Sequence, residues 1–285
     1  MSSKLIIRDR CFEWGQRTYL MGVLNVTPDS FSDGGEFNNT SGALAQAQAM
    51  VATGADIIDL GGQSTRPGAE QITVAEELDR VLTVLRVLRE KISVPISVDT
   101  TRATVAKASV EAGADIINDI SGGTFDLDML PTVASLDVPI VLMHTRGTPQ
   151  TMQQMTNYQD VIQEISSFLA QQIAIATATG INQNKIIIDP GIGFAKNYEQ
   201  NLEVFRRLYS LKALNRPILV GASRKSFIGR ILNQPEPKAR VWGTAAACCA
   251  AIFNGVDILR VHDIKEMREV SLVADALFRQ SPQQN

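Results

Sequence analysis

The chain has 285 residues, of which 45% are hydrophobic and 20% charged, so a disordered protein is excluded and a large core is possible. The length is typical of one (β/α)8 barrel with additional segments. A formal net charge of −3 argues against nucleic acid or an anionic membrane as partner. The sequence shows neither a signal peptide nor a bilayer-spanning apolar stretch, so we expect a soluble, cytoplasmic protein without membrane contact.

The three cysteines, Cys11, Cys248 and Cys249, do not have the spacing of a metal site, and an adjacent pair rarely forms a disulfide. We expect free, mostly buried thiols in a reducing compartment. Because His144 and His262 are the only histidines, a zinc site is not expected.

Residues 1–17 alternate in a way that predicts a short hairpin closing the bottom of a barrel. Eight apolar runs then predict buried strands: Tyr19–Asn25, Asp56–Leu60, Pro95–Asp99, Ile116–Asn118, Pro139–Met143, Ile186–Asp189, Pro217–Gly221 and Ile258–Val261. Helical periodicity follows each run: Ser41–Thr53, Val74–Lys91, Arg102–Ala112, Leu127–Ser135, Asp160–Thr179, Glu199–Leu211, Arg240–Phe253 and Ile264–Arg279.

Eight strand-and-helix units in strict alternation predict a single α/β domain over 1–285, a TIM barrel with a frayed tail at 280–285. A doubly wound open sheet is the alternative, and the even alternation favours closure. Long loops, rich in Gly, Pro, Ser, Thr and Asn, follow the first, second and fifth strands at Val26–Thr40, Gly61–Ile72 and His144–Gln159. Loops of this length on the catalytic face of a barrel usually serve as lids or ligand clamps.

Three segments read almost alike, Gly54–Asp59, Gly113–Asn118 and Gly255–Arg260, and each passes from a helix end through a glycine into a short strand. In a barrel the carboxyl ends of all strands meet at one face, so Asp59, Asn118 and Arg260 should line one pocket.

Polar residues end nearly every predicted strand: Asn25, Asp59, Asp99, Asn118, His144, Asp189, Ser223, Arg260 and His262. Any one of them could be a structural core group or a cap, but together they describe a deep polar funnel. Buried acids need partners, and a flat heterocycle with an amino-amide edge could donate two parallel hydrogen bonds to a carboxylate.

The other half of the pocket has the character of an anion site. Arg66 lies in a Gly-rich loop, and Lys225 precedes a short helix whose first residues, Ser226 and Phe227, would offer backbone N–H groups. Arg260 and His262 are two residues apart and therefore share one strand face.

The motifs resemble those of one known family. They are Asn25-Val-Thr-Pro-Asp-Ser-Phe-Ser-Asp-Gly-Gly35, Ser64-Thr-Arg-Pro-Gly68, Val98-Asp-Thr100, Ile117-Asn-Asp-Ile120, Asp189-Pro-Gly-Ile-Gly-Phe194, Ser223-Arg-Lys-Ser-Phe-Ile-Gly229 and Arg260-Val-His-Asp263. This ordered set, from about Tyr19 to the last helix, closely resembles dihydropteroate synthase of the bacterial folate pathway. The resemblance implies a (β/α)8 barrel that joins 6-hydroxymethyl-7,8-dihydropterin diphosphate to p-aminobenzoate and releases diphosphate. Sulfonamides would compete with the amine.

The resemblance also implies residue roles. Asn25 would contact Mg²⁺, the expected cofactor. The pterin ring would be held by Asp99, Asn118, Asp189 and Lys225, with Met143 and Val261 also in the substrate site. The diphosphate would be held by Thr65, Arg66, Arg260 and His262. The p-aminobenzoate would be received by Ser226, with Pro67 and Phe194 nearby, and Phe31 would be a further substrate-binding residue. The catalytic residues would be Lys225, Arg260, His262 and Arg66, in an SN1-like substitution at the pterin methylene. A homodimer is the implied assembly, with the Ala-rich helix Arg240–Phe253 as a possible packing surface.

Some positions depart from the family pattern. Gln63 stands where many members carry Glu, so a salt bridge of that residue would be absent. Thr145, Ala195-Lys-Asn197 and Gln200 also differ. Three other functions stay open: a methyltetrahydrofolate-dependent methyltransferase, a Schiff-base lyase using Lys225, and a non-catalytic pterin-binding module.

Overall fold

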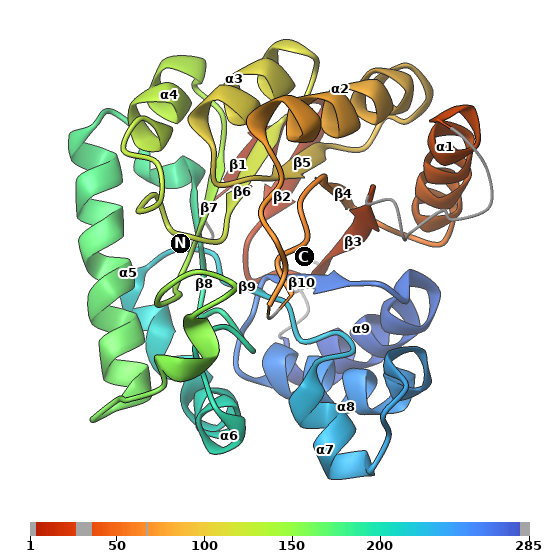
Figure 1. Cartoon of the computed structure of the whole chain (residues 1–285). Coiled ribbons are helices and arrows are strands. Elements are labelled where there is room, and N and C mark those ends of the chain that lie inside the picture. The colour runs from red at the N-terminus through yellow and green to blue at the C-terminus, as the bar shows by residue number, and fades with distance from the viewer. Residues whose placement is uncertain (1–3, 27–35, 67, 280–285) are drawn as a thin grey trace, which may run out of the picture.

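Eight parallel strands form the centre of the molecule (Figure 1). The computed structural model describes residues 4–26, 36–66 and 68–279. The strands are β3 (Tyr19–Asn25), β4 (Ile57–Gly61), β5 (Ile96–Asp99), β6 (Ile116–Asp119), β7 (Ile140–Met143), β8 (Ile186–Asp189), β9 (Leu219–Val220) and β10 (Ile258–Val261). They pair in the order β8-β7-β6-β5-β4-β3-β10-β9, and a parallel bridge between Ile188 and Ile218 joins the two ends. The predicted closed barrel is therefore confirmed, and the open sheet is ruled out.

Helices surround the barrel on the outside (Figure 1). They are α1 (Glu36–Ala52), α2 (Val74–Lys91), α3 (Ala103–Glu111), α4 (Met129–Leu136), α5 (Val161–Ala178), α6 (Tyr198–Arg207), α7 (Ser226–Leu232), α8 (Val241–Phe253) and α9 (Ile264–Phe278). Short 3₁₀ turns cover Met152–Gln154, Gln183–Lys185, Leu208–Leu214 and Pro237–Arg240. The capping box that begins α2 is confirmed: Thr73 Oγ1 accepts from Glu76 N at 3.2 Å, and Glu76 accepts from Thr73 N at 2.8 Å.

Several element boundaries differ from the sequence predictions. Helix α1 already includes Glu36, ahead of the predicted start at Ser41. The seventh barrel strand is limited to Leu219–Val220 within the predicted Pro217–Gly221. The helix predicted over Glu199–Leu211 ends at Arg207 and continues as a 3₁₀ turn. Helix ends commonly tighten in this way, because i to i+3 bonds satisfy the last carbonyl groups.

An N-terminal hairpin of β1 (Lys4–Ile7) and β2 (Arg10–Glu13) fills one end of the barrel. Its Leu5, Ile7 and Phe12 share a buried cluster with residues that begin barrel strands, such as Ile57 and Ile116. The predicted cap is thus present at the amino ends of the strands, which leaves the carboxyl ends as the open mouth.

The cysteines are all free, but Cys11 is exposed on β2, contrary to the expectation of mostly buried thiols; Cys248 is buried and Cys249 partly so. Within the described ranges, no helix is both long and apolar enough to cross a membrane. The predicted tail at 280–285 lies outside the described residues.

Candidate active site

Four polar residues from four strands are joined at the barrel mouth. Arg260 of β10 donates from Nε to Asp59 Oδ2 at 2.6 Å and from Nη2 to Asp99 Oδ2 at 2.9 Å. Asn118 of β6 donates to the same Asp59 oxygen at 3.2 Å. Asp59 is fully buried. Asp99 lies opposite Asn118 in the parallel register, whereas Asp59 lies opposite Ser97 and Arg260 opposite Met21, so long side chains join residues that differ in level. The structure thus brings Asp59, Asn118 and Arg260 into contact with one another, and their place in a substrate pocket stays a prediction.

Burial controls the protonation of the acids. It raises the pKa of Asp99 to about 7, while Arg260 opposes the rise and the nearby Asp59 adds to it. The same two acids raise the pKa of Arg260 above its ordinary value, although burial lowers it. A guanidinium between two carboxylates stays charged, so the mouth holds a buried cation together with acids that are ready to accept hydrogen bonds.

Asp189 ends β8 on the other side of the mouth. It is 6% exposed, and its Oδ1 accepts from Gly191 N at 2.7 Å. Burial raises the pKa of this carboxyl to about 6, against the lowering effects of the Gly191 hydrogen bond and of Lys225, Lys196 and Arg260. Met143 of β7 lies opposite Asp189 in the register and is buried.

Lys225 stands between the two groups of acids. Its Nζ lies 4.4 Å from the centre of the Phe194 ring, a cation–π contact. Burial lowers the pKa of Lys225 to about 8 and Arg260 lowers it further, while Asp189 and Asp99 raise it. Lys225 is also the N-cap residue of α7, so the exposed Ser226 is the first residue of that helix.

His262 follows β10, and its Nδ1 lies 3.0 Å from Ser223 Oγ. Burial lowers the pKa of His262 to about 3, with Arg224 and Arg260 adding to this. The imidazole is therefore neutral at pH 7 and is a hydrogen-bonding group rather than a cation. Arg224 is paired with Asp263 through Nε at 3.1 Å, so its charge is compensated by that acid.

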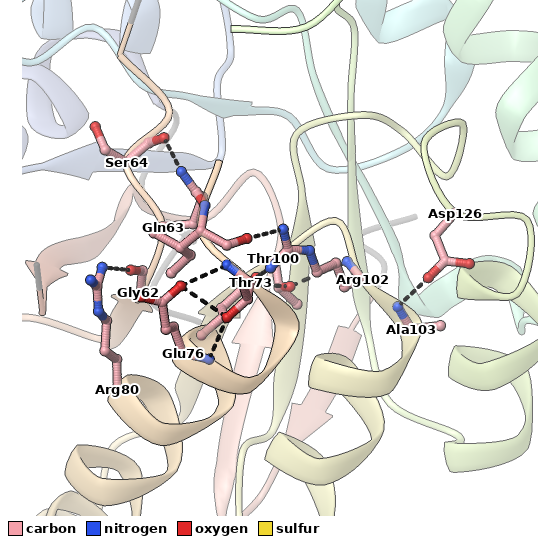
Figure 2. Close-up of polar contacts among 12 residues, drawn as sticks. Gly62, Gln63, Ser64, Thr73, Glu76, Arg80, Thr100, Arg102, Ala103 and Asp126 are labelled. Atoms are coloured by element: carbon pink, nitrogen blue, oxygen red, sulfur yellow. Dashed lines mark hydrogen bonds and ion pairs between the residues drawn. The ribbon is translucent and has the colours of Figure 1, made fainter. Parts of the chain in front are cut away.

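The loop after β4 carries Thr65 and Arg66 and is tied across its base (Figure 2). The Gln63 amide donates to Ser64 O at 2.9 Å and to Glu70 O at 2.8 Å, and its oxygen accepts from Ile72 N at 2.8 Å. Gln63 therefore makes three hydrogen bonds with loop backbone, in place of the salt bridge expected of a glutamate at this position.

The same loop is fastened to its surroundings. Arg102 donates to Ile72 O at 2.5 Å and to the buried Glu77 at 2.7 Å. A cavity of ≈ 40 Å³ lies beside the loop and has both Thr65 and Asp99 in its lining. Thr65 thus faces the acid side of the mouth, whereas Arg66 is exposed.

The structure also locates the remaining predicted residues. Val261 is buried in β10. Asn25 is the last residue of β3, and its side-chain oxygen lies beside Gly61 of β4: a Cβ atom added to that glycine would be 3.5 Å from Asn25 Oδ1. Pro67, expected in the amine site, and Phe31, expected to bind substrate, lie outside the described residues. Arg260, expected on the side of the diphosphate, has two of its nitrogens bonded to the acids.

One buried cation received no role from the sequence. Lys196 is 2% exposed, and its Nζ lies 3.0 Å from His144 Nδ1. The only available signal was its place two residues after Phe194 in the motif that begins at Asp189. Asp59 was expected in the pocket, but its contact with Arg260 over 201 residues was not foreseen.

The sequence from 21 to 262 matches the family model described as pterin binding enzyme. The chain belongs to this family. It is 56% identical over 268 residues to the dihydropteroate synthase of Synechocystis, covering 94% of this chain and 93% of that protein. The family resemblance drawn from the motifs is therefore confirmed.

Solved structures of family members have the same fold. The dihydropteroate synthase of Clostridium difficile, determined in the presence of pteroic acid, superposes with a TM-score of 0.90 at 46% identity and covers 94% of this chain and 100% of that one. The enzyme of Xanthomonas albilineans with 4-aminobenzoic acid has a TM-score of 0.91 at 39% identity, covering 97% and 98%.

Proposed function

We propose that this chain catalyses the dihydropteroate synthase reaction, which joins 6-hydroxymethyl-7,8-dihydropterin diphosphate to p-aminobenzoate in folate biosynthesis. The observation that carries the proposal is the joined set of Asp59, Asp99, Asn118 and Arg260 in the barrel mouth, with Asp189 and Lys225 nearby. A flat ring with an amino-amide edge supplies the donors and acceptors that such a set requires.

The pterin would lie among the acids. Asp99, Asn118 and Asp189 would pair with the donor edge, and Lys225 would donate to a ring carbonyl. The buried Met143 and Val261 would complete the walls. Because this well is shielded from water, each charged hydrogen bond there is stronger than at the surface.

The reaction breaks the bond between the pterin methylene carbon and the diphosphate oxygen, and the electron pair leaves with diphosphate. The electron-rich ring, with acids beside it, stabilises the developing cation. The neutral arylamine nitrogen then forms the new carbon–nitrogen bond and loses one proton. An arylamine needs little help from a general base, which agrees with the absence of a paired nucleophile and base from the motifs.

The leaving diphosphate would be received by Thr65, Arg66, His262 and Arg260. With Ser223 Oγ as donor to His262 Nδ1, 3.0 Å away, the imidazole would carry its proton on Nε2 and would donate it to an oxyanion. An arriving diphosphate would raise the pKa of this histidine, since a nearby anion favours the protonated form.

Mg²⁺ is the proposed cofactor, and Asn25 is the residue that would hold it. Among the described residues, no three His, Cys, Asp or Glu side chains form a metal-ligand group. Mg²⁺ commonly takes few protein ligands and completes its shell with substrate phosphates and water, so one amide oxygen at the mouth fits this ion. When bound, Mg²⁺ would neutralise charge on the leaving diphosphate.

The amine would bind on the outer side of the mouth, where Ser226 begins α7 beside Lys225 and Phe194. Phe31 and Pro67 would complete this site. A sulfonamide has the size and charge of p-aminobenzoate and should compete for it.

We also propose a cytoplasmic homodimer. Exposed apolar side chains are concentrated on α8 and α9: Trp242, Phe253, Leu272, Val273, Leu277 and Phe278. Large exposed apolar patches mark protein contacts, and a second copy of this chain is the proposed occupant. Light scattering should report twice the mass of one chain, and Trp242→Glu should shift the mass toward one chain.

The deciding experiment measures diphosphate release from the pterin substrate with Mg²⁺, with and without p-aminobenzoate. Amine-dependent release together with formation of dihydropteroate supports the proposal. A pterin-binding module would bind without release, and borohydride trapping of Lys225 with a carbonyl substrate would instead support a Schiff-base enzyme.

A further inference from the structure

The turn that follows β8 is built around one buried ammonium group. Between Asp189 and Lys196 the backbone adopts positive φ at Gly191 (70°), Gly193 (82°) and Ala195 (48°). A Cβ on Gly191 would lie 2.0 Å from His144 O, so the turn is pressed against the end of β7. A backbone of this kind persists only where its surroundings hold it.

Lys196 stabilises this turn. Its Nζ is 3.0 Å from Gly191 O, 3.0 Å from Phe194 O and 3.0 Å from His144 Nδ1. An ammonium has three protons, and here each has one acceptor. The two carbonyls belong to the turn and the imidazole to the segment after β7, so a single side chain fastens the turn to its neighbour.

The arrangement also determines the state of His144. Its ring is packed edge-on to Phe168, with 5.1 Å between the ring centres, and burial lowers its pKa to about 2. The imidazole is therefore neutral. Because Nδ1 accepts from Lys196, the ring proton must be on Nε2.

Lys196 has no carboxylate among these hydrogen-bonding partners, although an isolated buried charge is costly. The acid that favours its charged form is Asp189, and Lys225 and Arg146 oppose it. In return, Lys196, Lys225 and Arg260 all favour the ionised form of Asp189. Burial lowers the pKa of Lys196 to about 7, so the ammonium is charged below neutral pH, where Asp189 begins to take up a proton.

We propose that Lys196 is a positioning residue for pterin capture: its ammonium holds the turn that carries Phe194 and keeps a positive charge near Asp189, so that this carboxylate stays ionised and able to accept from the pterin. The inference rests on the proposed role of Asp189. It assigns to Lys196 no contact with substrate.

The test compares full-length wild type with Lys196→Met, which keeps the length of the side chain but removes the charge and the three donors. Lys196→Arg keeps the charge, and Lys107→Met, at an exposed lysine of α3, is the matched control. Affinity for 6-hydroxymethylpterin is measured by calorimetry from pH 5 to pH 8.5, and kcat and KM are measured over the same range.

In Lys196→Met the pH at which pterin affinity is half lost should rise by about one unit, because a cation that favoured the ionised carboxylate is gone. The KM for p-aminobenzoate should rise at least ~3-fold as the Phe194 turn loosens, an effect of roughly one lost hydrogen bond. Lys196→Arg should keep the wild-type midpoint, and Lys107→Met should match wild type throughout.

An unchanged midpoint in Lys196→Met would overturn the inference. A loss of affinity that is equal at every pH would overturn it as well, because it would indicate a structural role alone. A different result would contradict the proposed function itself: Asp189→Asn would then bind pterin as tightly as the wild type does.

If Lys196→Met does not fold, a measurement on the wild-type protein still tests the inference. Nitrogen-15 NMR of the two histidines, assigned with His262→Gln, should show His144 neutral with its proton on Nε2 from pH 5 to 6, where Lys196 is charged. A proton on Nδ1 would overturn the inference, because Lys196 would lose one of its three acceptors.

Discussion

Arg260 Nε donates to Asp59 Oδ2 at 2.6 Å, and this contact joins two strands at the floor of the active-site mouth. Asp59 is fully buried, so the pair is shielded from solvent. The second Asp59 oxygen has no hydrogen-bond partner among the described atoms. Arg260 therefore compensates the charge of a buried acid that keeps one oxygen without a partner in the described part of the chain.

Asp59→Ala should lower the free energy of unfolding by about 3–5 kcal/mol, because it leaves a buried guanidinium with one acid fewer. Asp59→Asn should have a smaller effect, since it can still accept one hydrogen bond. Urea unfolding measures both, with Asp79→Ala on the exposed face of α2 as the control expected within about 0.5 kcal/mol of wild type. An Asp59→Ala protein as stable as that control would mean that the contact contributes nothing to the fold.

Pterin capture should depend on pH through Asp189. The folded pKa of this carboxyl is raised to about 6 by burial, and only the ionised form accepts from the pterin N–H. Protonation of Asp189 should therefore weaken the affinity as the pH falls through about 6, approaching tenfold per unit for one proton. Titration calorimetry with 6-hydroxymethylpterin measures this, and Asp189→Asn should bind more weakly, by about 1–3 kcal/mol, and without that midpoint.

For the protein without pterin, the effect of Asp189 on folding stability has the opposite pH dependence to its effect on pterin affinity. A carboxyl whose folded pKa lies above its unfolded value stabilises the fold below the unfolded value, and this contribution is lost as the pH rises through the folded value. Bound pterin favours the ionised form, so added pterin should raise the melting temperature more at pH 8 than at pH 5.

His262 should matter for turnover more than for pterin binding. His262→Ala removes a neutral donor from the proposed diphosphate side, and loss of one such donor typically lowers kcat on the order of 10²-fold. Affinity for 6-hydroxymethylpterin, which has no diphosphate, should change by less than about threefold, well under the energy of one hydrogen bond to a charged group. Ser223→Ala, which frees the ring from its 3.0 Å contact, should give a smaller loss of kcat. Equal losses of pterin affinity and kcat in His262→Ala would place the imidazole at the ring instead.

Gln63 should set the shape of the loop that carries Thr65 and Arg66 (Figure 2). Gln63→Leu removes three hydrogen bonds to loop backbone. The KM for p-aminobenzoate should therefore rise by about 5- to 10-fold, which corresponds to roughly the net free energy of one hydrogen bond. The affinity for pterin should be unchanged. Gln63→Glu keeps the acceptor for Ile72 N but has no proton for the two carbonyls, so its defect should be smaller and should ease at low pH.

Steady-state kinetics at pH 6 and pH 8 measure both Gln63 variants, and Gln171→Leu on the exposed face of α5 is the control. A wild-type KM in Gln63→Leu would show that the loop keeps its shape without this amide.

The barrel was accessible from sequence because its signals are local. A short β-branched run such as Ile186–Asp189 predicts a buried strand by itself, and the Thr73 and Glu76 pair begins a helix within one turn. The two-residue strand Leu219–Val220 and the helix end at Arg207 were less accurately predicted, because pairing and tightening at element ends depend on neighbours elsewhere in the chain.

The sequence by itself determined that Asp59, Asn118 and Arg260 would meet, because parallel strands of similar length place their last residues at one mouth. Only the tertiary structure decided which of them bond: Arg260 reaches across 201 residues to Asp59 and 161 to Asp99, and Lys196 across 52 to His144. The physical reason is that strand periodicity defines the face to which a side chain belongs, whereas barrel closure and register define the distance between faces, and hydrogen bonds and pKa values depend on that distance.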